Sequence, residues 1–412
     1  MNRIIFLSIF IYIVFACSNS NDANNKNRGK NSNENIEKLE IIPGAERTDD
    51  YLHLISGLKV AVLTNQTGLV ADTHLVDTLL SVGVELVKIF CPEHGFRGIA
   101  DAGEKIGDSF DEKTGIPIVS LYGANNKPTQ QQLRNVEIII FDLQDVGVRF
   151  YTYISTLHYV MEACAENNIP LIVLDRPNPN AYYIDGPVLD TSIIKSFVGM
   201  HPVPVVYGMT IGEYAKMLNG EKWLANGIQC DLTVIPNKNY SHQMKYDLPV
   251  KPSPNLPNKR AIELYPSLCF FEGTVLSIGR GTDKQFQVIG HPGLKNVENI
   301  NYSFTPSPQP GAQNPKLNGK LCYGFDLSMN NDFFEDSDNA KLNLSLLIKT
   351  YELFPDKNNF FLKNNFFDLL AGNRELRKQI KNQVSEEQIR ASWEPQLSEF
   401  KEIRKKYLIY KE

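Results

Sequence analysis

Short apolar segments alternate with amphipathic segments from about residue 58 to residue 236. Runs such as Lys59–Thr64 and Val136–Asp142 are nearly continuous in apolar residues, as strands buried on both faces are. Segments such as Thr156–Asn167 instead place their apolar residues at helical spacing. This alternation predicts an α/β fold in which helices cover both faces of a parallel sheet. The other predicted strands are Val84–Phe90, Ile116–Leu121, Pro170–Asp175 and Asp231–Ile235, and the other helices are His74–Val82 and Ile211–Leu218.

The pattern changes after about residue 237. Residues 237–258 are rich in Pro, Asn and Lys and indicate a loop or linker, and residues 302–319 are a second proline-rich stretch. Helical spacing then returns toward the end of the chain. We therefore predict a Rossmann-like domain over residues 39–262 and a smaller mixed α+β domain over residues 263–412. The expected C-terminal helices are Leu342–Phe354, Phe366–Leu370 and Glu386–Tyr407.

The N-terminus has the composition of a bacterial export signal. Arg3 precedes the apolar run 4–15, which is shorter than a membrane-spanning segment. The run ends in Val-Phe-Ala-Cys17, which resembles a lipobox and makes Cys17 the candidate lipid-modified first residue of the mature protein. Ordinary secretory cleavage beside an incidental cysteine is the alternative. Residues 18–38, rich in Asn, Ser and Lys at their start, predict a flexible tether. From the lipobox we expect a lipid-anchored protein of the cell envelope, and it should face the periplasm because Ser18, with no acidic run after it, follows Cys17.

Composition excludes several classes of chemistry. The formal net charge of -5 offers no electrostatic footprint for nucleic acid. The cysteines that follow Cys17 are odd in number and have no Cys-x-x-Cys spacing, so neither a disulfide scaffold nor a zinc site is expected. The first predicted strand leads into Thr64-Asn-Gln-Thr-Gly-Leu69, which lacks the Gly-x-Gly-x-x-Gly pattern of dinucleotide sites. We therefore expect a Rossmann-like layout without a cofactor.

Polar side chains follow three of the predicted strands. Glu93 and His94 form a Pro-Glu-His-Gly turn after one strand, Asp142 ends the next strong strand, and the pair Asp175-Arg176 ends another. Because the carboxyl ends of parallel strands meet at one edge of a sheet, where ligands bind in open α/β folds, these residues form a candidate site. A solvated surface turn, or an Asp that caps the following helix, is the alternative for each.

The Pro-Glu-His-Gly turn is also one of several sequence blocks that share a resemblance. The blocks are Leu63-Thr-Asn-Gln-Thr-Gly68, Cys91-Pro-Glu-His-Gly-Phe-Arg-Gly98, Phe141-Asp-Leu-Gln-Asp-Val-Gly-Val-Arg-Phe-Tyr-Thr-Tyr153, Leu174-Asp-Arg-Pro-Asn-Pro179, Glu272-Gly-Thr and Gly279-Arg-Gly-Thr-Asp283. Their order and wording resemble the exo-β-N-acetylmuramidase family over roughly residues 55–410. The resemblance implies a catalytic Rossmann-like domain, an auxiliary domain and a cleft between them. It also implies release of N-acetylmuramic acid from the non-reducing end of peptidoglycan fragments, so the expected partners are MurNAc-GlcNAc saccharides.

The resemblance places the family's candidate catalytic glutamate at Glu93, which we predict to be the general acid. His94 is expected to form a hydrogen bond to Glu93 or to the sugar, with simple packing as its alternative. Glycoside cleavage also needs a group that activates water, attacks the anomeric carbon or orients the substrate's own acetamide. For a second carboxylate we prefer Asp142, then Glu272, then Asp175, and the acetamide-assisted route stays open.

Muramic acid carries a lactyl carboxylate, and a bidentate arginine is the natural partner of a carboxylate. The candidates are Arg149, Arg176 and Arg280, with Arg97 weaker, and the alternative for each is a structural ion pair. Tyr151 is expected to stack on the sugar ring, with core packing as its alternative.

Two other functions remain open from the residues alone. A non-catalytic lipoprotein that captures muropeptides or related sugars would need the same cleft and arginines but no catalytic acid. An amidase or peptidase is disfavoured, because the sequence contains no recognisable nucleophile or metal-binding constellation.

Overall fold

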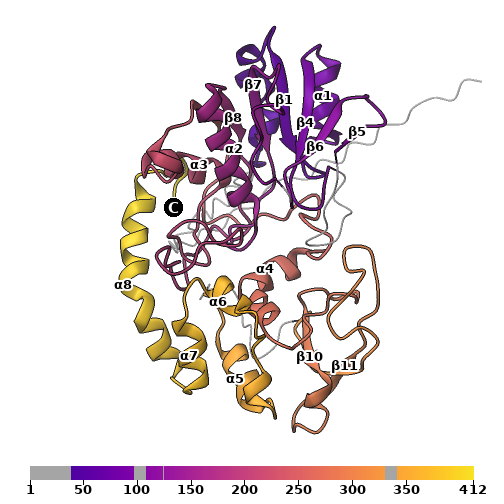
Figure 1. Ribbon diagram of the computed structural model, residues 1–412, viewed down its shortest axis with the longest axis vertical. Coiled ribbons are helices and arrows are strands. Elements are labelled where there is room, and N and C mark those ends of the chain that lie inside the picture. The colour runs from indigo at the N-terminus through magenta and orange to yellow at the C-terminus, as the bar shows by residue number, and fades with distance from the viewer. Residues whose placement is uncertain (1–38, 97–107, 124, 330–340) are drawn as a thin grey trace, which may run out of the picture. The chain divides into compact units, whose positions relative to one another are not determined.

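The structure, a computed structural model, describes residues 39–96, 108–123, 125–329 and 341–412 (Figure 1). Contacts group residues Glu40–Glu412 into one compact unit. The predicted α/β class is confirmed, because a mostly parallel seven-stranded sheet is followed by a smaller, antiparallel three-stranded sheet. No helix of the described residues is both long enough and apolar enough to cross a membrane.

The large sheet has the strand order β5-β6-β4-β1-β7-β8-β9. All of its strand pairs are parallel except β5–β6 at one edge. The carboxyl ends of β4, β1, β7 and β8 therefore share one edge, as expected from the alternation of strands and helices. The strands are β1 (Lys59–Thr64), β4 (Glu85–Cys91), β5 (Ser109–Phe110), β6 (Pro117–Ser120), β7 (Ile138–Asp142), β8 (Leu171–Leu174) and β9 (Leu232–Ile235).

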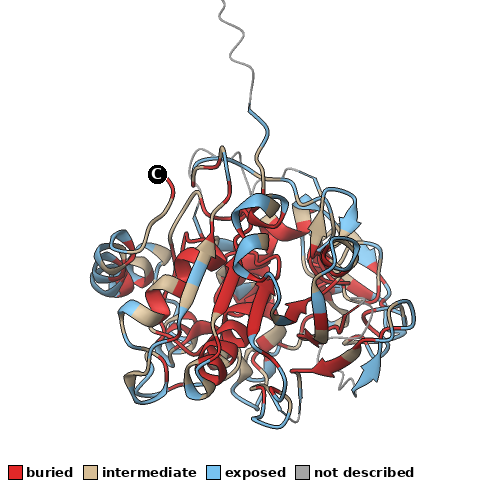
Figure 2. Ribbon diagram, turned by 90° about the horizontal axis from the view of Figure 1, so that it is seen from above, coloured by how far each residue is buried: buried red, intermediate tan, exposed pale blue. Residues whose placement is uncertain are grey.

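Both faces of this sheet are buried. In β1, Ala61 and Leu63 belong to one apolar cluster, whereas Val60 and Val62 belong to another. Figure 2 shows the buried strands in red, with helices packed around them. Burial on two faces explains why the strands are apolar throughout instead of alternating with polar residues. The first cluster is covered by α2 (Tyr153–Asn167) and α3 (Ile211–Gly220), and the second by α1 (Leu75–Ser81).

The C-terminal part combines helices with the three-stranded sheet β10-β12-β11. The predicted helices correspond to α5, α6 and α8, whereas α4 and α7 were not expected. The predicted boundary between residues 262 and 263 falls within α4, whose first turn is capped by the side chain of Asn258. The elements are α4 (Lys259–Leu268), β10 (Val288–His291), β11 (Tyr302–Phe304), β12 (Cys322–Asp326), α5 (Ser345–Leu353), α6 (Phe366–Ala371), α7 (Glu375–Lys381) and α8 (Glu386–Lys405).

The end of the chain packs back onto the Rossmann-like part. Arg404, near the end of α8, donates from Nε to the carbonyl oxygen of Gly208 over 2.8 Å. The Tyr410 hydroxyl then donates to Oδ2 of Asp175 over 2.5 Å, at the carboxyl end of β8. The larger apolar cluster likewise runs from the large sheet into the C-terminal helices. The contacts that join the two parts are thus buried ones.

Candidate active site

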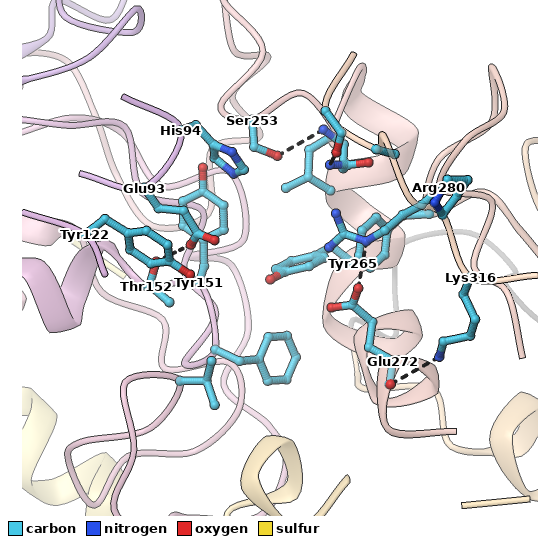
Figure 3. Close-up of a pocket in the computed structure, with 18 of the residues that line it drawn as sticks. Glu93, His94, Tyr122, Tyr151, Thr152, Ser253, Tyr265, Glu272, Arg280 and Lys316 are labelled. Carbon is cyan, nitrogen blue, oxygen red and sulfur yellow. Dashed lines mark hydrogen bonds and ion pairs between the residues drawn. The ribbon is translucent and has the colours of Figure 1, made fainter. Parts of the chain in front are cut away.

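A cavity of about 870 Å³ opens beside the turn that follows β4. This volume falls within the roughly 300–1,000 Å³ that is usual for small-molecule sites. Figure 3 shows two facing walls. Glu93, Tyr122 and Thr152 lie on one wall, and Glu272, Arg280 and Lys316 lie on the other.

The turn after β4 holds Glu93 and His94 at the cavity. Its Gly95 N–H donates to the carbonyl oxygen of Pro92 over 3.0 Å. His94 has a φ of 71°, a left-handed conformation that side chains larger than hydrogen adopt at a cost. Such strained residues are concentrated at functional sites. The side chains of Glu93 and His94 both line the cavity. This position agrees with the expectation that the turn lies at the ligand-binding edge of the sheet.

Two hydroxyl groups hold the Glu93 carboxylate. Thr152 Oγ1 donates to Oε2 of Glu93 over 3.0 Å, and the hydroxyl of Tyr122 is also hydrogen-bonded to Glu93. Burial, together with the charge of Glu93, raises the pKa of Tyr122, so its hydroxyl stays protonated and can donate at neutral pH. Neither hydroxyl was predicted, although Tyr122 directly follows a predicted strand whose end lies at the same sheet edge.

The facing wall is built on η5 (Cys269–Gly273) and the segments that contact it. Arg280 donates from Nε to Oε1 of Glu272 over 2.7 Å, and its guanidinium carbon lies 5.1 Å from the centre of the Phe286 ring. Lys316 donates from Nζ to the carbonyl oxygens of Thr274 (2.6 Å) and Glu272 (3.2 Å). Burial lowers the pKa of Lys316 to about 8. This end of the cavity therefore contains two cationic side chains and one carboxylate.

Comparison with known proteins identifies the family. The model of the N-terminal domain of the exo-beta-N-acetylmuramidase NamZ matches residues 60–260, and that of the C-terminal domain matches residues 263–410. The chain belongs to the NamZ family. It is 41% identical over 403 residues to the peptidoglycan beta-N-acetylmuramidase NamZ of Bacillus subtilis (strain 168), covering 92% of this chain and 93% of that protein.

Two crystal structures of DUF1343 family proteins from Bacteroides fragilis NCTC 9343 have the same fold. One is 46% identical, with a TM-score of 0.82 over 91% of this chain and 100% of that chain. The other is 29% identical, with a TM-score of 0.76 over 90% of this chain and 99% of that chain. The expected resemblance is therefore confirmed along nearly the whole chain.

Both NamZ family segments contribute to the cavity. Glu93 and Thr152 come from the N-terminal segment, and Glu272, Arg280 and Lys316 come from the C-terminal segment. Lys316 was not predicted, because it lies in the proline-rich stretch 302–319, where no periodicity or motif marks its single lysine as a site residue. Two predicted residues, Cys17 and Arg97, lie outside the described residues.

Asp142 and Arg176 lie at the expected sheet edge but not on the cavity. Arg176 donates from Nε to Oδ1 of Asp142 over 2.5 Å and from Nη2 to Oδ2 over 2.9 Å. The side chains are 0% and 4% exposed for Asp142 and Arg176, respectively. This bidentate pair occupies both carboxylate oxygens. We expected Asp142 to line the cavity as the second catalytic carboxylate, but it does not. Among the predicted alternatives, Glu272 is the carboxylate that does line it.

Arg149 is enclosed by backbone carbonyls. It donates to the oxygens of Pro187 (2.7 Å), Val203 (2.8 Å) and Leu370 (2.9 Å), and burial lowers its pKa to about 9. The guanidinium ties three distant segments together and does not line the cavity. The prediction of a sugar-facing arginine therefore rests on Arg280 among the described candidates.

Asp175 is also internal. Its carboxylate accepts hydrogen bonds from Tyr410 Oη (2.5 Å), Thr210 Oγ1 (2.7 Å) and Gly212 N (2.8 Å). Burial raises the pKa of Asp175, and the bonds from Tyr410 and Thr210 oppose that rise. Asp175 thus supports the start of α3, by accepting a first-turn N–H and the hydroxyl of the capping Thr210, and it anchors the end of the chain. This role is close to the helix-capping alternative for this residue.

Tyr151 lines the cavity and also belongs to the core. Its hydroxyl donates to the carbonyl oxygen of Pro252 over 2.8 Å, and its ring meets Tyr153 and Tyr265 edge to face. The ring is therefore held on three sides by protein. It can present an edge or a limited apolar surface to a sugar, but its orientation is set by the core.

Proposed function

We propose that this protein is an exo-acting β-N-acetylmuramidase that releases N-acetylmuramic acid from the non-reducing end of peptidoglycan fragments. The B. subtilis relative is named a peptidoglycan beta-N-acetylmuramidase, and the match covers 92% of this chain. The observation that carries the proposal is the place of Glu93. This half-buried carboxylate is held by Thr152 in a cavity to which both NamZ family segments contribute.

In the proposed reaction Glu93 is the general acid. It protonates the glycosidic oxygen while the bond from the anomeric carbon to that oxygen breaks, and the carboxylate then accepts a proton from the incoming water. Thr152 and Tyr122 fix the orientation of the carboxyl group through their hydrogen bonds. A positioned acid of this kind contributes roughly 10²- to 10⁴-fold to the rate.

Two groups are candidates for the second catalytic role. Glu272 is the other acidic side chain among the described residues of the cavity, but it lies on the facing wall in an ion pair with Arg280. The acetamide of the substrate is the second candidate, because such a group can attack its own anomeric carbon. Participation of the acetamide is favoured by the ion pair, which ties Glu272 to the facing wall.

We further propose that Cys17 is lipid-modified and anchors the protein in the cell envelope, facing the periplasm. The support is the short apolar run that ends in Val-Phe-Ala-Cys17, followed by a polar stretch. Cells that express the full chain are labelled with a fatty acid, beside a Cys17→Ser control. Label on the wild-type chain alone is expected, and an unlabelled wild-type chain would indicate ordinary secretion.

The activity is tested with the chain that lacks residues 1–17, which retains the compact unit Glu40–Glu412. It is incubated with a chromogenic β-N-acetylmuramide and with the matching β-N-acetylglucosaminide. Release from the muramide is expected, with a loss of about 10²- to 10⁴-fold in Glu93→Gln. Glu387→Gln is the matched control, because Glu387 is exposed on α8 and does not line the cavity.

The same experiment separates hydrolysis from sugar capture. An enzyme loses turnover in Glu93→Gln but still binds the muramide in calorimetry. Binding without release by the wild-type protein would indicate a muropeptide-capturing lipoprotein and would overturn the proposed activity.

A further inference from the structure

The guanidinium of Arg280 is held in place but has donors to spare. Its Nε is bonded to Glu272, and its plane is supported by the Phe286 ring. Within the described residues, its two terminal amino groups have no hydrogen-bond partner, and neither is sealed from solvent. The side chain as a whole is 23% exposed and lines the cavity. A guanidinium whose Nε is fixed and whose two terminal amino groups are open can bind an anion in bidentate fashion.

Lys316 gives this end of the cavity an excess of positive charge. Glu272 balances the charge of Arg280, and the ammonium of Lys316, when protonated, leaves the cluster with one net positive charge. The ammonium is bonded to carbonyl oxygens of the turn that carries Glu272, so all three charged groups are tied to one segment. The other acidic residue among the described lining residues, Glu93, lies on the opposite wall with Tyr122 and Thr152 (Figure 3).

The substrate has one group that matches this arrangement. N-acetylmuramic acid differs from N-acetylglucosamine by a lactyl ether that ends in a carboxylate, and the rest of the sugar is uncharged. We propose that Arg280, held by Glu272 and Phe286 and supported by Lys316, binds the lactyl carboxylate and selects muramic acid over glucosamine. This inference rests on the proposed function, because it places the muramic acid unit of that reaction against the wall formed by Glu272, Arg280 and Lys316.

The other two described candidate arginines do not compete for this role. Arg176 is engaged by Asp142 and by the carbonyl oxygen of Leu69, and Arg149 by three backbone carbonyls. Neither lines the cavity. A carboxylate that enters the cavity therefore meets the open donors of Arg280 on the wall that faces the catalytic glutamate.

The test compares an acid with its own ester. Three chromogenic substrates are used: the β-N-acetylmuramide, the same compound with its lactyl group as the methyl ester, and the β-N-acetylglucosaminide. The ester keeps the bulk of the lactyl group and removes its charge. The wild-type protein without residues 1–17 is expected to prefer the acid to the ester by about 10- to 10²-fold in kcat/KM, the range for hydrogen bonds to a charged group.

Arg280→Gln is expected to remove that preference, lowering kcat/KM for the acid while leaving the ester nearly unchanged. Arg280→Lys keeps a cation beside Glu272 but loses the fork, so an intermediate preference is expected. Arg134→Gln, at an exposed position away from the cavity, is the matched control. Equal losses for acid and ester in both Arg280 variants would overturn the inference, because a merely structural arginine would affect both substrates alike.

Failure of the proposed function has a different signature. In that case the wild-type protein releases nothing from any of the three substrates. Calorimetry with free N-acetylmuramic acid and N-acetylglucosamine still decides the role of Arg280, because binding needs no turnover. Selective binding of muramic acid that is weakened in Arg280→Lys and lost in Arg280→Gln supports the inference. Equal binding of both sugars by the wild-type protein, or selective binding that survives in Arg280→Gln, overturns it.

Discussion

Lys316 is expected to make the binding of muramic acid depend on pH. Burial lowers its pKa from 10.5 to about 8, a value within reach of ordinary assays. Below this pKa the lysine is protonated and the cluster with Glu272 and Arg280 has a net positive charge, whereas above it the cluster is neutral. The lactyl carboxylate is ionised on both sides of this pH, so its affinity for the site should fall as the pH rises through about 8.

The size of the effect follows from the protonated fraction of Lys316. For a pKa of about 8, this fraction falls from roughly nine-tenths at pH 7 to roughly one-tenth at pH 9. If the carboxylate is bound only by the protonated form, its affinity falls by up to about tenfold over that interval. A bound anion also raises the pKa of the lysine, because an opposite charge favours the protonated state.

Calorimetry with free N-acetylmuramic acid between about pH 6.5 and pH 9.5 measures this dependence, with N-acetylglucosamine as the uncharged comparison. Glu93 and His94 face the same cavity, and the second sugar reports any contribution they make to both ligands. Lys316→Met should bind muramic acid weakly at pH 7 and show no step near pH 8, while Lys349→Met, at an exposed site on α5, should keep the step. An affinity that stays flat through pH 8 in the wild-type protein, or a step that survives in Lys316→Met, would refute the reasoning.

Other substitutions test the remaining assignments. If the substrate acetamide attacks the anomeric carbon, Glu272→Gln should lower the steady-state kcat by less than about tenfold. A loss in kcat as large as that of Glu93→Gln, about 10²- to 10⁴-fold, would give Glu272 the second catalytic role. Arg176→Met leaves the Asp142 carboxylate buried without its partner, so urea titration should find the free energy of unfolding lower by about 3–5 kcal/mol, with KM unchanged in the folded protein. Arg149→Met removes a hydrogen-bond donor from three buried carbonyl oxygens, of which that of Val203 keeps a bond from the Leu189 N–H. The same titration should find a cost of about 2 kcal/mol or more, and a raised KM in either variant would contradict these structural roles.

The sheet could be predicted because its strands are buried on both faces. Continuous apolar runs such as Val136–Asp142, separated from one another by helical segments, are typical of the inner strands of a parallel sheet. The elements that were missed have weaker patterns. The helix α4 contains Pro266 and follows a proline-rich stretch, so its sequence indicates a loop, and its formation depends on the Asn258 cap and on burial against η5.

The candidate site was predicted only in part, because a strand end specifies an edge of the sheet but not the direction of a side chain. Glu93 follows β4 in a turn with left-handed residues, which places its side chain on the cavity. Asp142 ends β7 at the same edge, yet Arg176 from the end of the neighbouring strand reaches it and encloses both of its oxygens. The spacing of residues in the sequence does not indicate that Arg176 and Asp142 form this ion pair.

The facing wall was harder still to predict, because its residues meet only after the chain has folded. Glu272 and Arg280 lie near one another in sequence and belong to recognised blocks, whereas Lys316 arrives from a stretch with no periodic signal and bonds to carbonyl oxygens, which any lysine could do. Its effect on the site is nevertheless large, because it turns a neutral Glu–Arg pair into a cationic cluster. Family motifs therefore predict the position of Glu93 on the cavity better than they predict the charge of the wall formed by Glu272, Arg280 and Lys316, since that charge is a sum over residues contributed by separate segments of the chain.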